Sequence, residues 1–298
     1  MIATQENFAL EFGRGHGTEN DFVIVPDEYA QLGISPDRVR ALCDRRTGIG
    51  GDGLLRVARA GALVEAGEVS VLAPGIADHD WFMDYRNADG SVAQMCGNGM
   101  RVFAHWLVAQ KLIDVPAGQP WTVGTRAGAK QVVVHEATSD AATVSVHMGL
   151  PRVTGLSTVR MAGRRYAGLG VDMGNPHLAA VVPGLDAAGL HELELAPPAY
   201  DPEFFPEGVN VEIVTPLRSD DDGRNAVSMR VYERGVGETK SCGTGTVAAA
   251  CAALADAGAG EGEVIVHVPG GRVQVAITAG DAVLTGPSAI VATGKTVL

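Results

Sequence analysis

The chain of 298 residues is 46% hydrophobic and 19% charged, which provides enough apolar sequence for two domains of about 150 residues each. Its formal net charge of −12 at pH 7 excludes a nucleic acid or an anionic membrane as partner, because phosphate recognition requires clustered Lys and Arg. No run approaches the roughly 18 apolar residues of a membrane span. The first 12 residues lack the basic and apolar regions of a signal peptide, so we expect a cytoplasmic protein.

The N-terminal elements begin with a strand predicted at Asn20–Pro26 and a helix at Ser35–Cys43, which has Ser at its cap and Pro in its first turn. Gly48–Gly53 then matches the spacing of a dinucleotide-binding loop. A helix precedes this loop and a strand-like run, Leu54–Val57, follows it, which is the reverse of the context that nucleotide binding requires. We therefore interpret the loop as a tight turn that carries backbone toward a ligand or the other domain.

The next elements lead to a cysteine at a predicted helix start. Strands at Glu68–Leu72 and Asp80–Tyr85 precede a polar turn, and the motif Cys96-Gly97-Asn98-Gly99 follows. After it comes Val102–Ala109, a run without Pro or Gly that predicts a helix. We place the domain boundary near Arg126, so that residues 1–126 form the first domain.

The second half follows a similar plan. Strands are predicted at Gln131–His135, Ala142–Val146, the apolar run from Pro176 to Val182, Glu207–Val214, Met229–Gly235, Val264–Val268, Arg272–Ile277 and Ala289–Ala292. The motif Cys242-Gly243-Thr244-Gly245 precedes another predicted helix, Val247–Leu254. Cys96 and Cys242 are 146 residues apart (242 − 96), and Asn20 and Asn175, each before an apolar strand, are 155 apart (175 − 20). These similar offsets favour an internal duplication. The pattern predicts an α/β fold of two domains, each a curled mixed sheet or barrel around a central helix.

Two cysteines at helix N-termini permit a particular chemistry. The free N–H groups and the helix dipole there stabilise anions, including a thiolate. If the two helix ends face each other across a cleft between the domains, one sulfur removes a proton from a carbon while the other delivers one from the opposite side. The amides of Gly97, Asn98, Gly243 and Thr244 would stabilise the adjacent carboxylate. The expected result is inversion of a stereocentre without a cofactor.

Each of these residues also has a plainer interpretation. One Cys-Gly-x-Gly motif alone is more often a buried, inert cysteine, and Cys43 beside Val39 and Leu42 is a core residue. His177 would then be a hydrogen-bonded loop histidine, and Glu233 with Arg234 a surface ion pair of small energetic value. The remaining polar candidates would be turn or cap residues: Asn20, Asn87, Asn175 and Asn210. Four cysteines are too few for a disulfide scaffold, and no Cys or His spacing predicts a metal site.

Seven ordered motifs together resemble the diaminopimelate epimerase family over nearly the whole chain. They are Asn20–Phe22, Thr47–Asp52, Asn87–Ser91, Cys96–Gly99, Gly174–His177, Pro206–Asn210, and Glu233–Gly235 with Cys242–Gly245. The family interconverts LL- and meso-diaminopimelate, for lysine and bacterial cell-wall synthesis, without pyridoxal phosphate or metal. The resemblance implies that each chain has two pseudo-symmetric α/β domains, one of residues 1–126 plus about 287–298 and one of residues 127–286. It also implies that two such chains form a homodimer.

The resemblance also implies roles for individual residues. Cys96 and Cys242 would be the acid and base, and Asn20 would join the amides of Gly97, Asn98, Gly243 and Thr244 in holding the reacting end of the substrate. Asn87, Asn175, Asn210, Glu233 and Arg234 would hold the distal amino acid group. His177 and Glu233 would also lie near the thiols and influence which is ionised. The chain departs from the family at Gly53, where many members have Gln, so one side-chain contact to substrate is expected to be absent or replaced by water.

Two rival functions fit the same two cysteines. A cofactor-free racemase or epimerase of proline or hydroxyproline would share the architecture, although Arg234 and the asparagines favour a substrate with a second charged end. A thiol redox protein would cycle Cys96 and Cys242 through a disulfide. Entry of solvent deuterium at the substrate α-carbon separates an epimerase from a redox protein.

Overall fold

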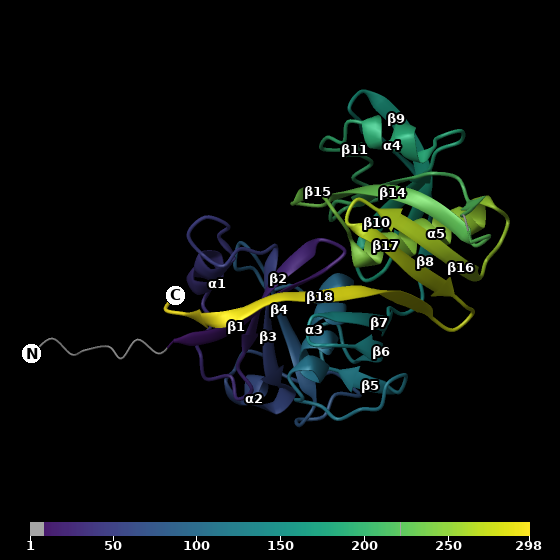
Figure 1. Cartoon of the computed structure of the whole chain (residues 1–298). Helices are drawn as coiled ribbons and strands as arrows, with labels where there is room; N and C mark the ends of the chain where they lie inside the picture. Colours follow the sequence, from purple (N-terminus) through teal and green to yellow (C-terminus); the bar gives the residue numbers. More distant parts are fainter. Residues whose placement is uncertain (1–8, 221) are drawn as a thin grey trace, which may run out of the picture. The chain divides into compact units, whose positions relative to one another are not determined.

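The computed structural model describes residues 9–220 and 222–298, so most of the N-terminal segment considered above as a signal peptide lies outside the described residues. The chain divides into two compact units. Unit 1 comprises the described residues up to Gly17, Asp21–Ala142 and Ser288–Leu298, and unit 2 comprises Thr18–Asn20 and Thr143–Pro287. Figure 1 labels the elements of both units. Among the described residues, no helix combines the length and the apolar character needed to cross a membrane.

The strands of unit 1 form a mixed sheet. β2 (Asn20–Pro26) runs parallel to β3 (Gly53–Arg59), and β3 runs antiparallel to β4 (Trp81–Asn87). An isolated bridge between Phe82 and Gly124 joins β4 to the strand pair β5 (Pro120–Val123) and β6 (Lys130–Ala137). At the other side, β1 (Leu10–Gly17) pairs with β2 and with the end of β18 (Ala282–Thr296).

Helix α3 (Gly97–Ala109) is the central helix of unit 1. It packs against β1, β3, β4 and β6, and its residues from Gly97 to Leu107 are all buried. The other two helices lie elsewhere on this unit: α1 (Pro36–Cys43) packs through Val39, Leu42 and Cys43 against apolar residues of β2 and β3, and α2 (Ala60–Glu65) packs against β3 and Phe82. Ser35 caps α1 by accepting a hydrogen bond from the amide of Arg38, as its sequence predicts.

The strands of unit 2 also pair both in parallel and antiparallel, and among the described residues they belong to the same 18-stranded sheet as those of unit 1. The strands of this unit are β7 (Ala141–His147), β8 (Arg152–Met161), β9 (Arg164–Asp172), β10 (Pro176–Val181), β11 (Ala199–Tyr200), β12 (Asn210–Val214), β13 (Arg218–Ser219), β14 (Asn225–Glu233), β15 (Gly237–Thr239), β16 (Gly262–Val268) and β17 (Gly271–Ile277). β10 pairs in parallel with β12, and β12 pairs antiparallel with β14. β14 also pairs in parallel with β16. β16 pairs antiparallel with β17, and β17 pairs antiparallel with β18.

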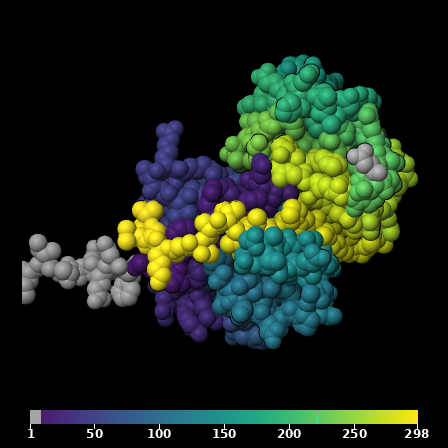
Figure 2. All heavy atoms as spheres, in the orientation of Figure 1, coloured from purple at the N-terminus to yellow at the C-terminus, as the bar shows by residue number. Residues whose placement is uncertain are grey.

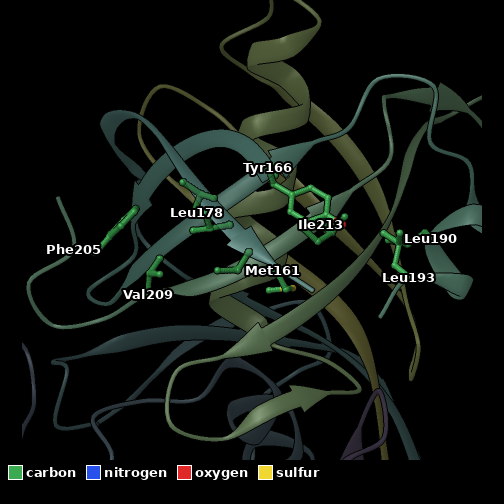
Figure 3. Packing of buried hydrophobic residues seen from close by; sticks show 11 residues of the cluster. Met161, Tyr166, Leu178, Leu190, Leu193, Phe205, Val209 and Ile213 are labelled. Carbon is green, nitrogen blue, oxygen red and sulfur yellow. The ribbon is translucent and has the colours of Figure 1, made fainter. Parts of the chain in front are cut away.

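The strands β10 and β12 pack against different elements on their two faces. On one face, Leu178, Val211 and Ile213 belong to an apolar cluster that includes Leu190 of α4 (Ala187–Glu192) and the loop residue Phe205. Figure 3 shows the labelled side chains of this cluster gathered against the strands. On the other face, Ala179 of β10 packs against Ala248 and Ala252 of α5 (Gly243–Asp256), the central helix of unit 2. Because side chains alternate along a strand, neighbours two residues from Ala179 also face α5.

The long strand β18 contributes to both units. Its first half pairs with β17, and residues from Ala289 to Thr296 pair with β1. Residues 291–298 are mostly exposed, and Figure 2 shows the yellow end of the chain on the surface beside the purple N-terminal strand. The last strand therefore returns to the first unit.

The expected α/β fold class is confirmed, with a sheet that is open and not closed into a barrel. Three details differ from the sequence analysis. Residues 127–142 group with unit 1 because β6 pairs with β5, whereas we placed the boundary at residue 126. The prediction of a strand at Glu68–Leu72 is wrong, since Glu68–Val71 form bends and Leu72 has no regular structure. The antiparallel pair of β8 and β9 was not predicted.

Candidate active site

Cys96 is the N-cap residue of α3. Its backbone is extended, with φ −142° and ψ 120°, and its sulfur accepts a hydrogen bond from the amide of Gly99 at 3.4 Å. The cysteine is half-buried, whereas Gly97 and Asn98 after it are buried. A side chain at position 99 would crowd Leu55, because an added Cβ lies 3.1 Å from Leu55 Cδ2. The glycine therefore lets the first turn of α3 approach β3 closely.

Cys242 has the same local geometry at the start of α5. Its φ and ψ are −127° and 119°, and its sulfur accepts a hydrogen bond from the amide of Gly245, also at 3.4 Å. The sulfur is further 3.5 Å from Oγ1 of Thr244. Cys242 is buried, and burial together with the nearby carboxylates of Glu233 and Glu212 raises the pKa of its thiol well above the ordinary value. At neutral pH Cys242 is therefore a thiol.

The sheet face under the start of α5 carries three ionisable side chains from three neighbouring strands. Glu212 of β12 pairs in register with Ala179 of β10, two residues beyond His177, and with Val231 of β14, two residues before Glu233. His177, Glu212 and Glu233 therefore project from the same face. His177 and Glu212 are fully buried, and Nδ1 of His177 lies 2.7 Å from Oε1 of Glu212.

Glu212 is the residue of this group that the sequence analysis missed. It lies in β12, whose five residues are all buried. Glu212 is the one charged residue of this strand. A charged side chain in a fully buried strand requires a partner, so this pattern was the available signal. Burial raises the pKa of Glu212 despite the opposing effect of His177. The pKa of Glu233 is raised as well, first by burial, with hydrogen bonds from Thr239 and Cys242 opposing.

The predicted asparagines of unit 2 lie around this group. Asn175 is between His177 and Thr244: its Oδ1 is 3.1 Å from Nε2 of His177, and its Nδ2 is 3.5 Å from Oγ1 of Thr244. The side chain of Asn210 forms two hydrogen bonds to the backbone. Its Nδ2 donates to the carbonyl of Pro176 at 2.9 Å, and its Oδ1 accepts from the amide of Arg234 at 2.9 Å.

Two further candidates belong to unit 2. Nη1 of Arg234 donates to the carbonyl of Glu207 at 2.6 Å, and the side chain is 40% exposed. Asn20 groups with unit 2, at the end of the turn in which Oγ1 of Thr18 donates to Oγ of Ser241, the residue before Cys242, at 2.8 Å. The turn that contains Asn20 is thus connected to the start of α5.

The candidates of unit 1 outside α3 lie on β3 and β4. Nδ2 of Asn87, at the end of β4, donates to Oγ of Ser91 at 2.9 Å. Gly53, opposite Asn87 in register, has no room for a side chain, since an added Cβ would lie 2.6 Å from Cε2 of Tyr85. The ring of Tyr85 therefore occupies the space that a longer residue at position 53 would use. Arg101 of α3 is fully buried, and burial lowers its pKa to about 10, against an opposing effect of Cys96.

All four cysteines are free thiols. Within residues 9–220 and 222–298, no group of three or more His, Cys, Asp or Glu side chains is arranged to hold a metal ion. What the two helix starts offer chemically is a thiol group beside the backbone amides of a first helical turn, and in unit 2 also a buried acid and histidine. The cleft expected between the domains, and the substrate contacts expected of the individual residues, stay predictions.

Solved structures show which proteins share the fold. A hydroxyproline epimerase from Agrobacterium vitis aligns with a TM-score of 0.61 at 14% identity, covering 97% of this chain and 92% of that one. A PhzF-family phenazine biosynthesis protein from Bacillus anthracis aligns with a TM-score of 0.65 at 14% identity, covering 97% and 99%. At such identities the likeness concerns the fold alone.

Sequence relatives are much closer. A diaminopimelate epimerase of Corynebacterium aurimucosum is 61% identical over 97% of this chain and 100% of its own length, and one of Rhodococcus opacus is 55% identical over 96% of each. With this fold, these relatives and a cysteine at each of two helix starts, the protein is an isomerase of the epimerase class. The chain belongs to the diaminopimelate epimerase family, whose model matches residues 12–154 and 169–293.

Proposed function

We propose that the protein interconverts LL- and meso-2,6-diaminopimelate by a two-cysteine mechanism. Cys96 and Cys242 act on the same α-carbon, one as thiolate that accepts the α-proton and the other as thiol that donates a proton to the opposite face. The observation that carries this proposal is the matched geometry of the two residues: each caps a central helix, and each sulfur is 3.4 Å from the amide three residues later. No cofactor takes part.

The surroundings of the two sulfurs support a division of roles in the free enzyme. Burial and two carboxylates favour the thiol form of Cys242, so it starts as the acid. Cys96 is half-buried and lies near the cationic Arg101, and we assign it the role of base. The isomer whose α-proton faces Cys96 is then processed directly, and the reverse reaction requires the opposite ionisation.

The acidity of the α-proton requires help from the chain. A carbanion next to a carboxylate is poorly stabilised in water, and hydrogen-bond donors fixed in place lower its energy. The amides of Gly97, Asn98, Gly243 and Thr244 lie in the first turns of α3 and α5, where the helix dipole favours an anion. We assign them, with Asn20, to the reacting carboxylate.

The distal amino acid group of the substrate is assigned to the polar residues around the two helix starts. These are Asn87, Asn175, Asn210, Glu233 and Arg234, with His177 supporting. The side chain of Asn210 already bonds Pro176 and Arg234, so we assign it the shaping of this loop. Tyr85, which occupies the space over Gly53, takes the place of the Gln contact of other family members.

The wider setting is also a proposal. The protein would act in the cytoplasm as a homodimer. Its product, meso-diaminopimelate, would be used in lysine and peptidoglycan synthesis. These assignments follow from membership of the family.

The function is tested by incubating the purified protein with LL-diaminopimelate in heavy water. The expected products are the LL and meso isomers at equilibrium, with one solvent deuterium at the inverted α-carbon. Proline and hydroxyproline, supplied in parallel, should stay unlabelled. Labelling of proline with none of diaminopimelate would favour a proline racemase, and an absence of label in every substrate would rule out proton transfer.

A further inference from the structure

His177 and Glu212 form a buried hydrogen-bonded pair, and the proposed mechanism assigns no role to Glu212. Both ring nitrogens of His177 face an oxygen: Nδ1 lies 2.7 Å from Oε1 of Glu212, and Nε2 lies 3.1 Å from Oδ1 of Asn175. An amide oxygen only accepts hydrogen bonds, so Nε2 carries a hydrogen. The Nδ1 side then requires one more proton, which is either on His177 as an imidazolium or on Glu212 as a carboxylic acid.

The surroundings keep this proton in place. His177 and Glu212 are both 0% exposed, and a buried lone carboxylate is costly unless it is neutralised or paired. Oε1 of Glu212 also lies against the first turn of α5, because an added Cβ on Gly245 would be 2.5 Å from it. The amide of Gly245 donates to the sulfur of Cys242. Glu212 thus lies between the histidine and the helix start that carries the cysteine.

The next link is the amide of Asn175. With its Oδ1 bound to the hydrogen on Nε2 of His177, its Nδ2 is turned toward Thr244, 3.5 Å from Oγ1. If the shared proton left, the ionised Glu212 would take the remaining ring hydrogen at Nδ1, because a charged acceptor forms the stronger hydrogen bond. Nε2 would then be an acceptor, and Asn175 would have to turn its NH2 group inward and its oxygen toward Thr244.

We propose that Glu212 is a positioning residue that acts through His177: the proton shared by these two side chains fixes which end of the Asn175 amide is presented at the start of α5. This inference rests on the proposed function, in which Asn175 binds the distal end of the substrate. Loss of the shared proton at high pH would present an oxygen where the substrate requires a donor. Substrate binding should then weaken with rising pH, independently of the cysteine that performs the proton transfer.

The test uses the full-length enzyme with Glu212→Gln, which keeps the size of the side chain but removes its titration. The NH2 group of Gln donates to Nδ1, so Nε2 keeps its hydrogen at every pH. In wild type, KM for diaminopimelate should rise over the alkaline range by at least tenfold more than in Glu212→Gln, where only the effects of other titratable groups remain. Glu212→Leu, which leaves Nδ1 without a partner, should raise KM at all pH values. Glu263→Gln, a change of an exposed β16 carboxyl, should behave as wild type.

A spectroscopic readout is independent of activity. Long-range 1H–15N spectra of 15N-histidine protein, with the His177 signal assigned from a His177→Gln sample, report which ring nitrogen carries hydrogen. We expect Nε2–H at neutral pH in both proteins, a change at alkaline pH in wild type, and none in Glu212→Gln.

The other titratable groups facing this pair are Glu233 and Cys242, and their effects on pH dependence would persist in Glu212→Gln. The proposal would be overturned by a KM profile that is the same in wild type and Glu212→Gln. It would also be overturned by a neutral His177 ring in wild type at neutral pH with hydrogen on Nδ1 and none on Nε2. If the spectra behave as expected but the protein does not epimerise diaminopimelate, the proposed function fails and the proton-sharing pair stands.

Discussion

Cys96 and Cys242 are N-cap residues of the central helices of their own units, and the sulfur of each accepts a hydrogen bond at 3.4 Å from the amide three residues later. Cysteine is an unusual cap, since Ser, Thr, Asp and Asn are preferred there. The use of sulfur twice at the same position supports the role in reactivity that we propose for both cysteines. The surroundings then distinguish the two, because Cys242 is buried beside Glu233 and Glu212.

The ionisation of Cys242 should respond to Glu233. Burial is the first cause of the raised pKa of this thiol, and the charge of Glu233 is the second. Glu233→Gln removes that charge and should lower the pKa of Cys242, because a nearby like charge shifts a pKa by about one unit or more. Iodoacetamide labelling of the Cys242 peptide at pH 8, measured by mass spectrometry without substrate, should become roughly tenfold faster. The Cys251 peptide of the same protein serves as internal control, and equal Cys242 rates in both proteins would refute the electrostatic account.

Gly245 should tolerate no side chain. An alanine Cβ would lie 2.5 Å from Oε1 of Glu212, so the carboxyl or the helix start must move. Gly245→Ala should lower the free energy of unfolding by about 1–3 kcal/mol, the usual cost of overpacking, and should reduce kcat/KM at least tenfold. Gly260→Ala is the matched control, because no heavy atom lies within 4 Å of its added Cβ. Urea unfolding and steady-state kinetics measure both, and wild-type behaviour of Gly245→Ala would contradict the placement of Glu212.

Asp84 should be a main contributor to the stability of unit 1. It is fully buried and accepts hydrogen bonds from Arg86 at 2.8 Å and from Arg126 at 2.5 Å. Burial opposes its ionisation, but the two guanidinium groups outweigh burial and lower the pKa of the carboxyl. Asp84→Asn leaves these cations without their shared anion, so the free energy of unfolding at pH 7 should fall by about 3–5 kcal/mol.

The pH dependence of the Asp84 effect has a definite sign. A carboxyl with a lowered folded-state pKa contributes its full stability above its unfolded pKa of about 3.9 and loses it as pH falls through the folded value. The difference between wild type and Asp84→Asn in urea unfolding should therefore be constant from pH 7 to about pH 4 and should shrink below that. Asp256→Asn, an exposed change at the end of α5, should stay within about 0.5 kcal/mol of wild type. A constant difference down to pH 2 would exclude the ionic contribution.

The sequence predicted the two cysteine helices because their signal is local: a glycine-rich start followed by a run without Pro or Gly. The helix at residues 36–43 and the strand after Gly53 were predicted for the same reason. The strand expected at Glu68–Leu72 fails because Glu68 is bound by distant residues, pairing with Arg56 and Arg86 at 2.6 Å each. The β8 and β9 pair was missed because it exposes apolar residues such as Leu156, which is 81% exposed, so no alternation marks it.

The site was predicted unevenly for related reasons. Cys96, Cys242, His177 and Glu233 stand in short motifs, which a sequence reveals. Glu212 stands in an apolar strand without a motif, and its importance depends on the register that brings it beside His177, which is a property of the folded sheet. The internal bonds of Asn210 are likewise visible only in the structure.

The most direct measurement of the central claim compares wild type with Cys96→Ala and Cys242→Ala, each incubated with LL- or meso-diaminopimelate in heavy water. Two cysteines that serve one α-carbon predict that either substitution lowers epimerisation by at least about a thousandfold, the size of effect seen when one member of a catalytic unit is removed. Circular dichroism should show both variants folded. Epimerisation at a near wild-type rate in either folded variant would contradict the two-cysteine mechanism.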